Sequence, residues 1–189
     1  MRIIGGTRRG LRLTGVGEGD VEAHLRPTSD RVREAIFNLL INGGHGNPVA
    51  GARVLDLFAG TGALGLEALS RGAAEVTFVD DGAKALALLR ANIARMRAGG
   101  ETRVLRLDAT RLGKAPNAPF TLVFLDPPYG KAMGEAALAA AHMGGWLAPE
   151  AMIVWEESTA PVPPPGFRSI DQRRYGDTLV TLMRAPSGV

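Results

Sequence analysis

A run of four apolar residues, Leu122–Leu125, leads directly into Asp126, Pro127, Pro128 and Tyr129. An unbroken apolar run of this kind is typical of a strand that is buried on both faces of a parallel sheet. Pro127 ends such a strand, because it has no N–H group for the hydrogen bonds of the sheet. Asp126 is therefore predicted at the carboxyl end of a buried strand, where open α/β sheets bind their ligands.

The residues that follow this strand combine two hydrogen-bond acceptors with a flat ring. The prolines fix φ and hold the Pro127 carbonyl as a rigid acceptor beside the Asp126 carboxylate. Two acceptors next to the Tyr129 ring suit a planar amine, such as the NH₂ group of a nucleobase. The alternative is a strand followed by a Pro-Pro turn with one exposed acid, in which Tyr129 is a core aromatic.

Strand-like and helix-like segments alternate along most of the chain. This order predicts right-handed crossovers and a doubly wound, mainly parallel α/β sheet of the Rossmann-like type. We expect seven strands, with the last two closing the sheet as an antiparallel hairpin. The segments are 53–65 (a strand, a glycine loop and the start of a helix to about 71), 75–80 (strand), 82–96 (helix), 103–107 (strand), 120–125 (strand), 134–142 (helix), 152–155 (strand), 167–170 (strand) and 178–183 (strand), with 171–177 as a connection.

The N-terminal region is rich in arginine. We expect residues 1–45 to form a short extension, consisting of a hairpin and a helix that Ser29 or Asp30 caps, and residues 46–189 to form the main domain. No acid occurs within residues 2–12. The hypothesis is that arginines of the extension contact phosphates of a nucleic acid, and the alternative is a solvated charged arm. These arginines are Arg2, Arg8, Arg9, Arg12, Arg26, Arg31 and Arg33.

Composition excludes several other classes of protein. The chain has no cysteine, which rules out disulfides and thiolate metal sites. The three histidines stand apart in the sequence, so no metal site is predicted. We find no signal peptide and no membrane-spanning segment in the sequence, and we expect a cytoplasmic location.

A glycine loop indicates a nucleoside cofactor. Gly60, Gly62 and Gly65 match the G-x-G-x-x-G fingerprint, and Asp80 follows about 20 residues later, where an acid binds ribose hydroxyls. This pattern alone is compatible with NAD. Asp56, inside the preceding strand, would repel a pyrophosphate but suits the ammonium group of a methionine tail.

Two further features favour S-adenosylmethionine over NAD. Asp108, predicted to end the third strand, can accept a hydrogen bond from the adenine amine, and no His or Tyr-x-x-x-Lys stands at a strand end to support hydride transfer. The alternatives are a solvent-bonded carboxylate at Asp56 and a loop cap at Asp108. The predicted cofactor-binding residues are Asp56, Phe58, Ala59, Gly60, Thr61, Gly62, Asp80, Asp108 and Asp126.

Several motifs together resemble a known family. Residues 56–62 and 126–129 are similar to the paired motifs of class I methyltransferases that act on exocyclic or planar nitrogens. Residues 26–38 (RPTSDRVREAIFN), 2–6 and 175–178 resemble the RsmD family of bacterial guanine-N2 methyltransferases of small-subunit ribosomal RNA. Asp81 departs from the pattern of such enzymes, which leaves open whether Asp80 or Asp81 binds the ribose. We prefer Asp80.

The resemblance implies a methyltransferase that uses S-adenosylmethionine and acts on 16S ribosomal RNA, either naked or within the assembled subunit. Asp126, Pro127, Pro128 and Tyr129 would be its catalytic residues. A DNA adenine-N6 methyltransferase is the alternative enzyme, because the catalytic motif is shared with that class. A NAD-binding oxidoreductase and a non-catalytic RNA-binding module are more remote alternatives.

Overall fold

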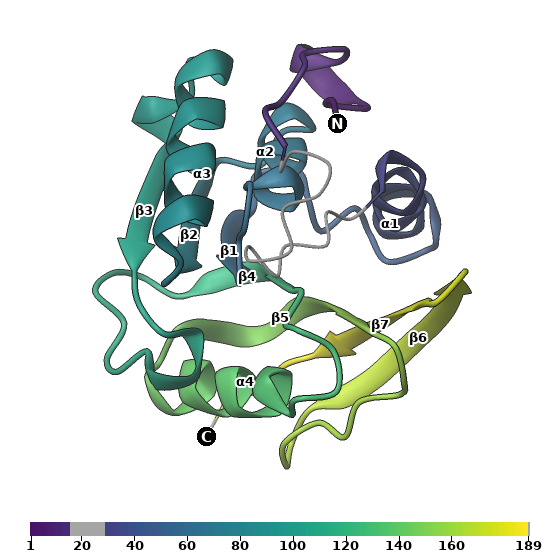
Figure 1. Ribbon diagram of the computed structural model, residues 1–189. Coiled ribbons are helices and arrows are strands. Elements are labelled where there is room, and N and C mark those ends of the chain that lie inside the picture. Colours follow the sequence, from purple (N-terminus) through teal and green to yellow (C-terminus); the bar gives the residue numbers. More distant parts are fainter. Residues whose placement is uncertain (16–28, 189) are drawn as a thin grey trace.

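The computed structural model describes residues 1–15 and 29–188. Arg26, and most of a predicted loop at 14–22, lie outside the described residues. A seven-stranded sheet with the order β3-β2-β1-β4-β5-β7-β6 forms the centre of the molecule (Figure 1). The strands are β1 (Arg53–Leu57), β2 (Glu75–Asp80), β3 (Thr102–Arg106), β4 (Phe120–Leu125), β5 (Leu147–Glu157), β6 (Arg168–Tyr175) and β7 (Thr178–Arg184).

The direction of the strands confirms the predicted fold class. Neighbouring strands from β3 to β5 pair in parallel, whereas β7 pairs antiparallel with both β5 and β6. The order of connections reverses between β1 and β4, which makes their carboxyl ends the topological switch point of the sheet.

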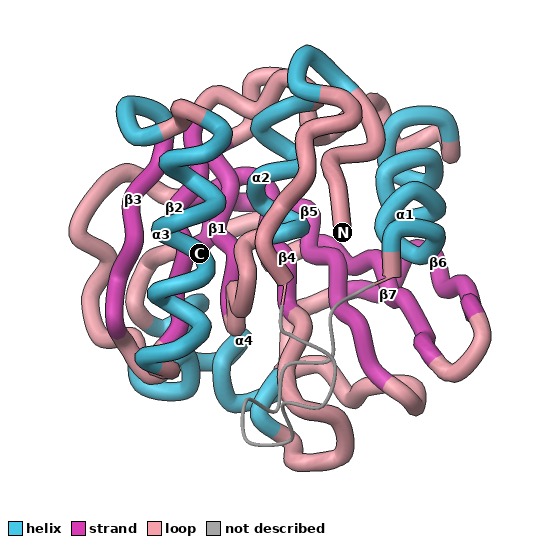
Figure 2. The backbone as a smooth tube through the Cα atoms, turned by 45° about the horizontal axis from the view of Figure 1, so that its top comes forward, coloured by secondary structure: helices cyan, strands magenta, loops and turns pink. Residues whose placement is uncertain are grey.

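Helices cover both faces of this sheet (Figures 1 and 2). One face, here called the three-helix face, packs against α1 (Asp30–Asn42), α2 (Ala63–Ser70) and α3 (Ala83–Met96), and the α4 face packs against α4 (Met133–Met143). Each face has its own apolar core. Short 3₁₀ turns occur at η1 (Gly6–Arg8), η3 (Gly99–Glu101) and η4 (Ala109–Arg111). Across residues 1–15 and 29–188, no helix has the length and apolar content that crossing a bilayer requires.

Two predicted boundaries are wrong in the C-terminal third. β5 begins at Leu147 rather than at Met152, because an irregular register lets Leu147 pair with Phe120 before the regular ladder starts. Residues 171–175, predicted as a connection, belong to β6 and pair with β7. β6 is the edge strand and its side chains are mostly exposed, so its sequence carries no apolar signal.

The N-terminal extension begins with a short hairpin. The Ile3 N–H donates to the Leu11 carbonyl over 2.9 Å, and the Gly10 N–H donates to the Ile3 carbonyl over 2.8 Å. Ile3 and Leu13 are buried in the core of the three-helix face together with Phe37 of α1. The extension and the sheet therefore share one apolar core.

Candidate active site

A large cavity opens at the carboxyl ends of β1, β2, β4 and β5. Its volume is about 1430 Å³, and its lining includes Asp56, Asp80, Asp126 and Glu156. Pockets for single small ligands typically measure about 300–1,000 Å³. This cavity is therefore large enough for a nucleoside cofactor together with a target base.

The glycine loop between β1 and α2 has a left-handed backbone. The φ angles are 59° at Phe58, 54° at Gly60 and 80° at Gly62. A Cβ atom on Gly62 would lie 2.4 Å from Cδ1 of Leu89, so a larger residue there requires the Leu89 side chain of α3 to shift, and the positive φ angle also disfavours any residue other than glycine. The loop thus lies close against the helix and presents its backbone to the cavity.

Asp56 is the most deeply buried acid of the cavity. Its side chain is 2% exposed and accepts a hydrogen bond from the Gly65 N–H over 2.9 Å. Burial raises the pKa of Asp56 well above its usual range, against the effect of this hydrogen bond, and the charges of Asp126 and Asp80 raise it further. The alternative of a solvent-bonded carboxylate is wrong, and a bound cation would offset the cost of ionising this group.

Asp80 holds the glycine loop from the end of β2. Its carboxylate accepts from the Gly60 N–H over 2.8 Å and from the Gly82 N–H over 2.9 Å. Burial raises the pKa of Asp80, and these two hydrogen bonds oppose the rise. Asp81 is exposed, and both acids line the cavity, so the preference for Asp80 as the ribose ligand stays a prediction.

Asp108 follows β3, which ends at Arg106. Its carboxylate caps η4 by accepting from the N–H of Thr110 over 2.9 Å and from its hydroxyl over 2.6 Å, as the loop-cap alternative expects. These hydrogen bonds lower the pKa of Asp108. Asp108 also lines the cavity, and its contact with adenine stays a prediction.

The segment Asp126–Gly130 leaves the end of β4 and lines the cavity as far as Tyr129. The Tyr129 hydroxyl lies 3.2 Å from Oγ1 of Thr178, the first residue of β7. The Gly130 N–H donates to Oε1 of Glu157 over 3.1 Å. Contacts with β5 and β7 therefore fix the position of this segment.

Three acids form a row on the three-helix face. On β1, β4 and β5, a residue buried in the core of that face stands two positions before the acid. Side chains two positions apart in a strand point to the same face of the sheet. Asp56, Asp126 and Glu156 therefore point to the same side, in the order of adjacent strands. The three core residues are Val54, Phe124 and Val154.

Sequence reasoning missed several residues of the cavity. The turn between β6 and β7 lines the cavity, whereas in the sequence residues 175–178 indicated only a resemblance to the RsmD family. Glu156 follows the apolar run of β5, and that pattern of an acid after a buried strand could have found it. The lining residues that were not predicted include Lys84, Lys131, Glu156 and Arg174–Thr178.

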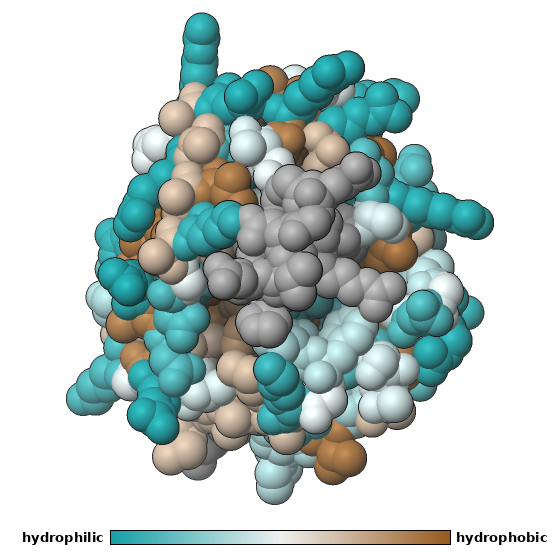
Figure 3. Space-filling model, viewed as in Figure 1, coloured by the Kyte–Doolittle hydropathy of each residue, from teal (hydrophilic) through white to brown (hydrophobic). Residues whose placement is uncertain are grey.

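Exposed arginines surround a second, smaller groove beside the cavity. Arg2, Arg9 and Arg31 line this groove of about 320 Å³, together with Asp30 and other residues. Arg31 also lines the main cavity. Hydrophilic side chains project from the upper part of the molecule in Figure 3, where the N-terminal hairpin lies in Figure 1. Arg12 is exposed on the same hairpin.

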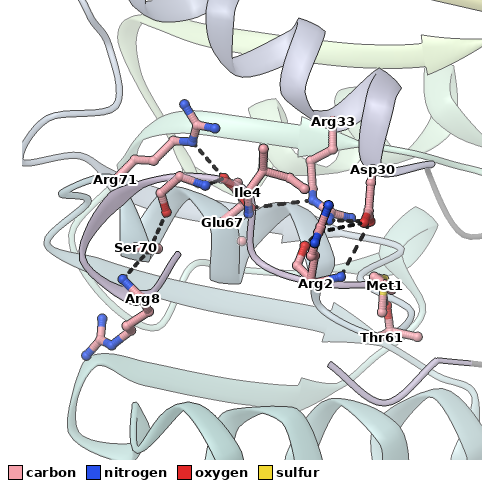
Figure 4. A network of polar contacts seen from close by, with 12 residues as sticks. Met1, Arg2, Ile4, Arg8, Asp30, Arg33, Thr61, Glu67, Ser70 and Arg71 are labelled. Carbon is pink, nitrogen blue, oxygen red and sulfur yellow. Dashed lines mark hydrogen bonds and ion pairs between the residues drawn. The ribbon is translucent and has the colours of Figure 1, made fainter. Parts of the chain in front are cut away.

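The prediction that Arg33 contacts a nucleic acid is wrong. Its side chain is 0% exposed, so no phosphate can reach the guanidinium group. Arg33 instead donates to the Arg2 carbonyl and to Asp30 Oδ1, the latter over 2.8 Å, and its Nε lies 3.6 Å from Oε2 of Glu67 (Figure 4). Arg8 is half-buried and forms an ion pair of 3.0 Å with Glu101.

Glu67 of α2 anchors the N-terminal hairpin. Its buried carboxylate accepts from the Ile4 and Gly5 N–H groups, each over 2.8 Å, and from Nε of Arg71 over 2.7 Å (Figure 4). The hairpin that carries the exposed arginines is therefore fixed relative to the helix that follows the glycine loop.

A second link joins the extension to the glycine loop. The buried Asn92 side chain of α3 accepts from the Thr14 N–H over 2.7 Å and donates to the Thr61 carbonyl over 3.0 Å. It also donates to the Thr14 carbonyl. The predicted cofactor loop and the predicted RNA-contacting extension thus share a single side-chain partner.

Comparison with known proteins gives consistent matches. The family described as "Conserved hypothetical protein 95" matches residues 1–184. Ribosomal RNA small subunit methyltransferase D of Escherichia coli K12 is 41% identical over 157 residues, which cover 82% of this chain and 74% of that protein. The protein of the same name from Haemophilus influenzae is 38% identical over 160 residues, which cover 82% of this chain and 78% of that protein.

Solved structures agree with these matches. The structure of yhhF from Escherichia coli has a TM-score of 0.80 and 35% identity, and the alignment covers 99% of this chain and 98% of that one. TrmN from Thermus thermophilus has a TM-score of 0.66 and 26% identity, covering 86% of this chain and 51% of that one. The chain therefore belongs to the conserved hypothetical protein 95 family, the RsmD family of class I methyltransferases.

Proposed function

We propose that this methyltransferase transfers a methyl group from S-adenosylmethionine to the exocyclic N2 of a guanine in 16S ribosomal RNA. The observation that carries the proposal is the position of Asp126, one strand away from Asp56 and on the same side of the sheet, in a single cavity. The names of the relatives from Escherichia coli and Haemophilus influenzae support ribosomal RNA of the small subunit as the substrate.

The lining of the cavity fits the proposed cofactor. The left-handed loop from Phe58 to Gly62 offers backbone groups at close range, and Asp56 would pair with the ammonium group of the methionine tail. Asp80 would accept from the ribose hydroxyls, and Asp108 from the adenine amine. When bound, S-adenosylmethionine supplies an electrophilic methyl group on a positively charged sulfur.

Asp126 and Pro127 would prepare the target amine. The lone pair of guanine N2 is delocalised into the ring, which makes this nitrogen a poor nucleophile. If the Asp126 carboxylate and the Pro127 carbonyl accept its two hydrogens, the lone pair is localised and aimed at the methyl group. After the methyl transfer, the nitrogen would release one of these hydrogens as a proton, which the Asp126 carboxylate would accept. Tyr129 would stack on the base once it has left its helix.

The extension, residues 1–45, would bind the RNA next to the catalytic domain, residues 46–189. Arg2, Arg9 and Arg31 are exposed and line the smaller groove, which shares Arg31 with the cavity, and Arg12 is exposed on the same hairpin. These arginines would bind phosphates that flank the target base. Arg8 would contribute less, because its guanidinium is already paired. A substrate of this kind implies a cytoplasmic location.

Identification of the methylated nucleoside tests the proposal. The protein is incubated with labelled S-adenosylmethionine and, separately, with small ribosomal subunits that lack the modification, deproteinised 16S RNA, and DNA. Each product is then digested and its nucleosides are separated. We expect N2-methylguanosine from at least one of the two ribosomal substrates, and their relative rates show whether the subunit must be assembled. N6-methyladenine from DNA, or label in no nucleoside, would contradict the proposal.

A further inference from the structure

Glu156 lies beside Asp126 but outside the proposed catalytic motif. It is the tenth of the eleven residues of β5, its side chain is 2% exposed, and it lines the cavity. Leu125 of β4 pairs with Trp155 of β5, so the residues that follow them, Asp126 and Glu156, are neighbours at adjacent strand ends. Both point to the three-helix face.

The order of the strands places Glu156 on the target side of Asp126. Asp56 stands on β1, which also leads into the glycine loop, whereas Glu156 stands on β5, on the opposite side of β4. Glu156 pairs with Val180 of β7, two residues after the Thr178 that contacts the Tyr129 hydroxyl. Glu156 therefore belongs to the half of the cavity in which the target base would sit against Tyr129.

The neighbouring acid has a different role. Glu157 accepts from the Gly130 N–H over 3.1 Å and from the Ser158 N–H over 2.7 Å, so its oxygens hold the loop after β4. Successive residues of a strand point to opposite faces, which separates Glu157 from the row of acids on the three-helix face. Glu156 is thus the acid of this pair whose side chain is directed to the target half of the cavity.

A carboxylate at this position distinguishes guanine from adenine. Guanine presents two neighbouring donors on its pairing edge, the N1–H and the N2 amine, whereas adenine presents an amine next to a bare N1 lone pair. A carboxylate only accepts hydrogen bonds, so it attracts the guanine N1–H and repels the adenine N1. Enzymes that act on an extruded base read this same edge.

We propose that Glu156 is the specificity-determining residue of the target site, accepting the N1–H of guanine while Asp126 and the Pro127 carbonyl hold the N2 amine. The proposal rests on the function proposed above. It also explains why a catalytic motif shared with adenine methyltransferases would serve a guanine enzyme, since the choice of base lies on the adjacent strand.

The test uses two RNAs that differ only in the target base. The position methylated by the wild-type protein is mapped first, and the substrate RNA is rebuilt by ligation with either guanine or 2-aminopurine at that position. 2-Aminopurine keeps the N2 amine, has an acceptor in place of the N1–H and lacks the O6 carbonyl. The readout is the ratio of single-turnover rates on the two RNAs, measured for each variant, so that any intrinsic difference in amine reactivity cancels between variants.

We expect the wild-type protein to prefer guanine strongly. Glu156→Gln should lower the ratio about tenfold to a hundredfold, the range for one hydrogen bond to a charged group, because its amide NH₂ donates to the N1 of 2-aminopurine. Glu156→Ala should also lower the ratio, since it removes both attraction and repulsion. Glu156→Asp keeps the carboxylate and should retain most of the preference. Glu135→Gln, on α4 and away from the cavity lining, is the matched control and should leave the ratio unchanged.

Three results would overturn the assignment. The first is a wild-type ratio near one, and the second is an unchanged ratio in both Glu156→Gln and Glu156→Ala. The third is loss of transfer to both RNAs in both variants while the melting temperature and adenosylhomocysteine affinity stay normal, which would assign Glu156 to the chemistry rather than to the choice of base. Failure of the proposed function gives a different result, because the wild-type protein would then form no N2-methylguanine.

Discussion

Replacing Glu67 tests how the N-terminal hairpin is attached. Glu67 and Arg33 are both completely buried, with Arg33 Nε 3.6 Å from the Glu67 carboxylate. Glu67→Ala removes this partner and also leaves the N–H groups of Ile4 and Gly5 without their acceptor. The substitution therefore removes the shared partner of one buried charge and two backbone donors.

The structure supports a large effect. Removing one partner of a buried ion pair costs about 3–5 kcal/mol, because the remaining charge stays desolvated. The entropy of unfolding is about 2.1 cal/mol/K for each residue, or roughly 0.4 kcal/mol/K for a chain of 189 residues. Glu67→Ala should therefore lower the melting temperature by about 8–12 °C. Asp30 still pairs with Arg33, which favours the lower part of that range.

Thermal melting and hydrogen exchange measure this prediction. The matched control is Glu101→Ala, which removes a partly exposed partner of Arg8 and should shift the melting temperature by no more than about 2 °C. Glu67→Gln keeps one acceptor oxygen and should fall between the two. In Glu67→Ala, the amides of Ile4 and Gly5 should also lose protection against exchange. Equal melting temperatures for Glu67→Ala and Glu101→Ala, or unchanged protection of these amides, would refute the anchoring role of Glu67.

Two further predictions concern cofactor and RNA. Burial raises the pKa of Asp56, so its contribution to stability is complete below the unfolded value near 3.8 and is lost as pH rises through the folded value. Asp56→Asn should therefore melt at a higher temperature than the wild-type protein at pH 8 but not at pH 4, which melting curves across pH measure. The same variant should bind adenosylhomocysteine at least tenfold more weakly, as measured by calorimetry. A difference in melting temperature that is equal at both pH values would count against the argument. The double variant Arg9→Ala, Arg12→Ala should lower the salt dependence of RNA binding by roughly two units with unchanged adenosylhomocysteine affinity, and an unchanged slope would leave the hairpin as a solvated arm.

The order of strands and helices could be predicted because their signals are local. The apolar run of β4, the glycine loop after β1 and the helical spacing in α3 each depend on neighbours within one element. Only the first part of the edge strand β6 was predicted, and residues 171–175 were assigned to a connection, because an exposed strand pairs through its backbone and leaves no pattern in side-chain polarity.

The role of Arg33 could not be predicted for a different reason. Arg33 lies three, four and seven residues before Ile36, Phe37 and Leu40, which is the spacing of the buried side of α1. This spacing indicates a buried position but does not say what would pair with the charge. An arginine is rarely buried without a partner. That partner, Glu67, is 34 residues away in the sequence, and only the packing of α1 against α2 brings the two together.

The same limit applies to the cavity. Asp56 was found because it interrupts the apolar strand β1, and Asp126 because it directly follows the apolar strand β4. The structure places Asp126 at the end of β4, as the sequence predicts. The Tyr129–Thr178 contact and the part played by the β6–β7 turn depend on the antiparallel return of β7 beside β5. No local pattern reports that return.

The Asp126→Ala variant tests most directly whether Asp126 acts in methyl transfer rather than in cofactor binding or stability. The measurement takes three values on one protein sample: melting temperature, adenosylhomocysteine affinity and single-turnover methylation rate. If Asp126 holds the target amine, the rate should fall about a hundredfold, equivalent to about 3 kcal/mol, while cofactor affinity and melting temperature stay close to those of the wild-type protein. Asp126→Asn should fall between the two, because an amide oxygen still accepts a hydrogen bond but carries no charge. Parallel losses in all three values, or a normal rate in Asp126→Ala, would contradict the assignment of Asp126 to the chemistry.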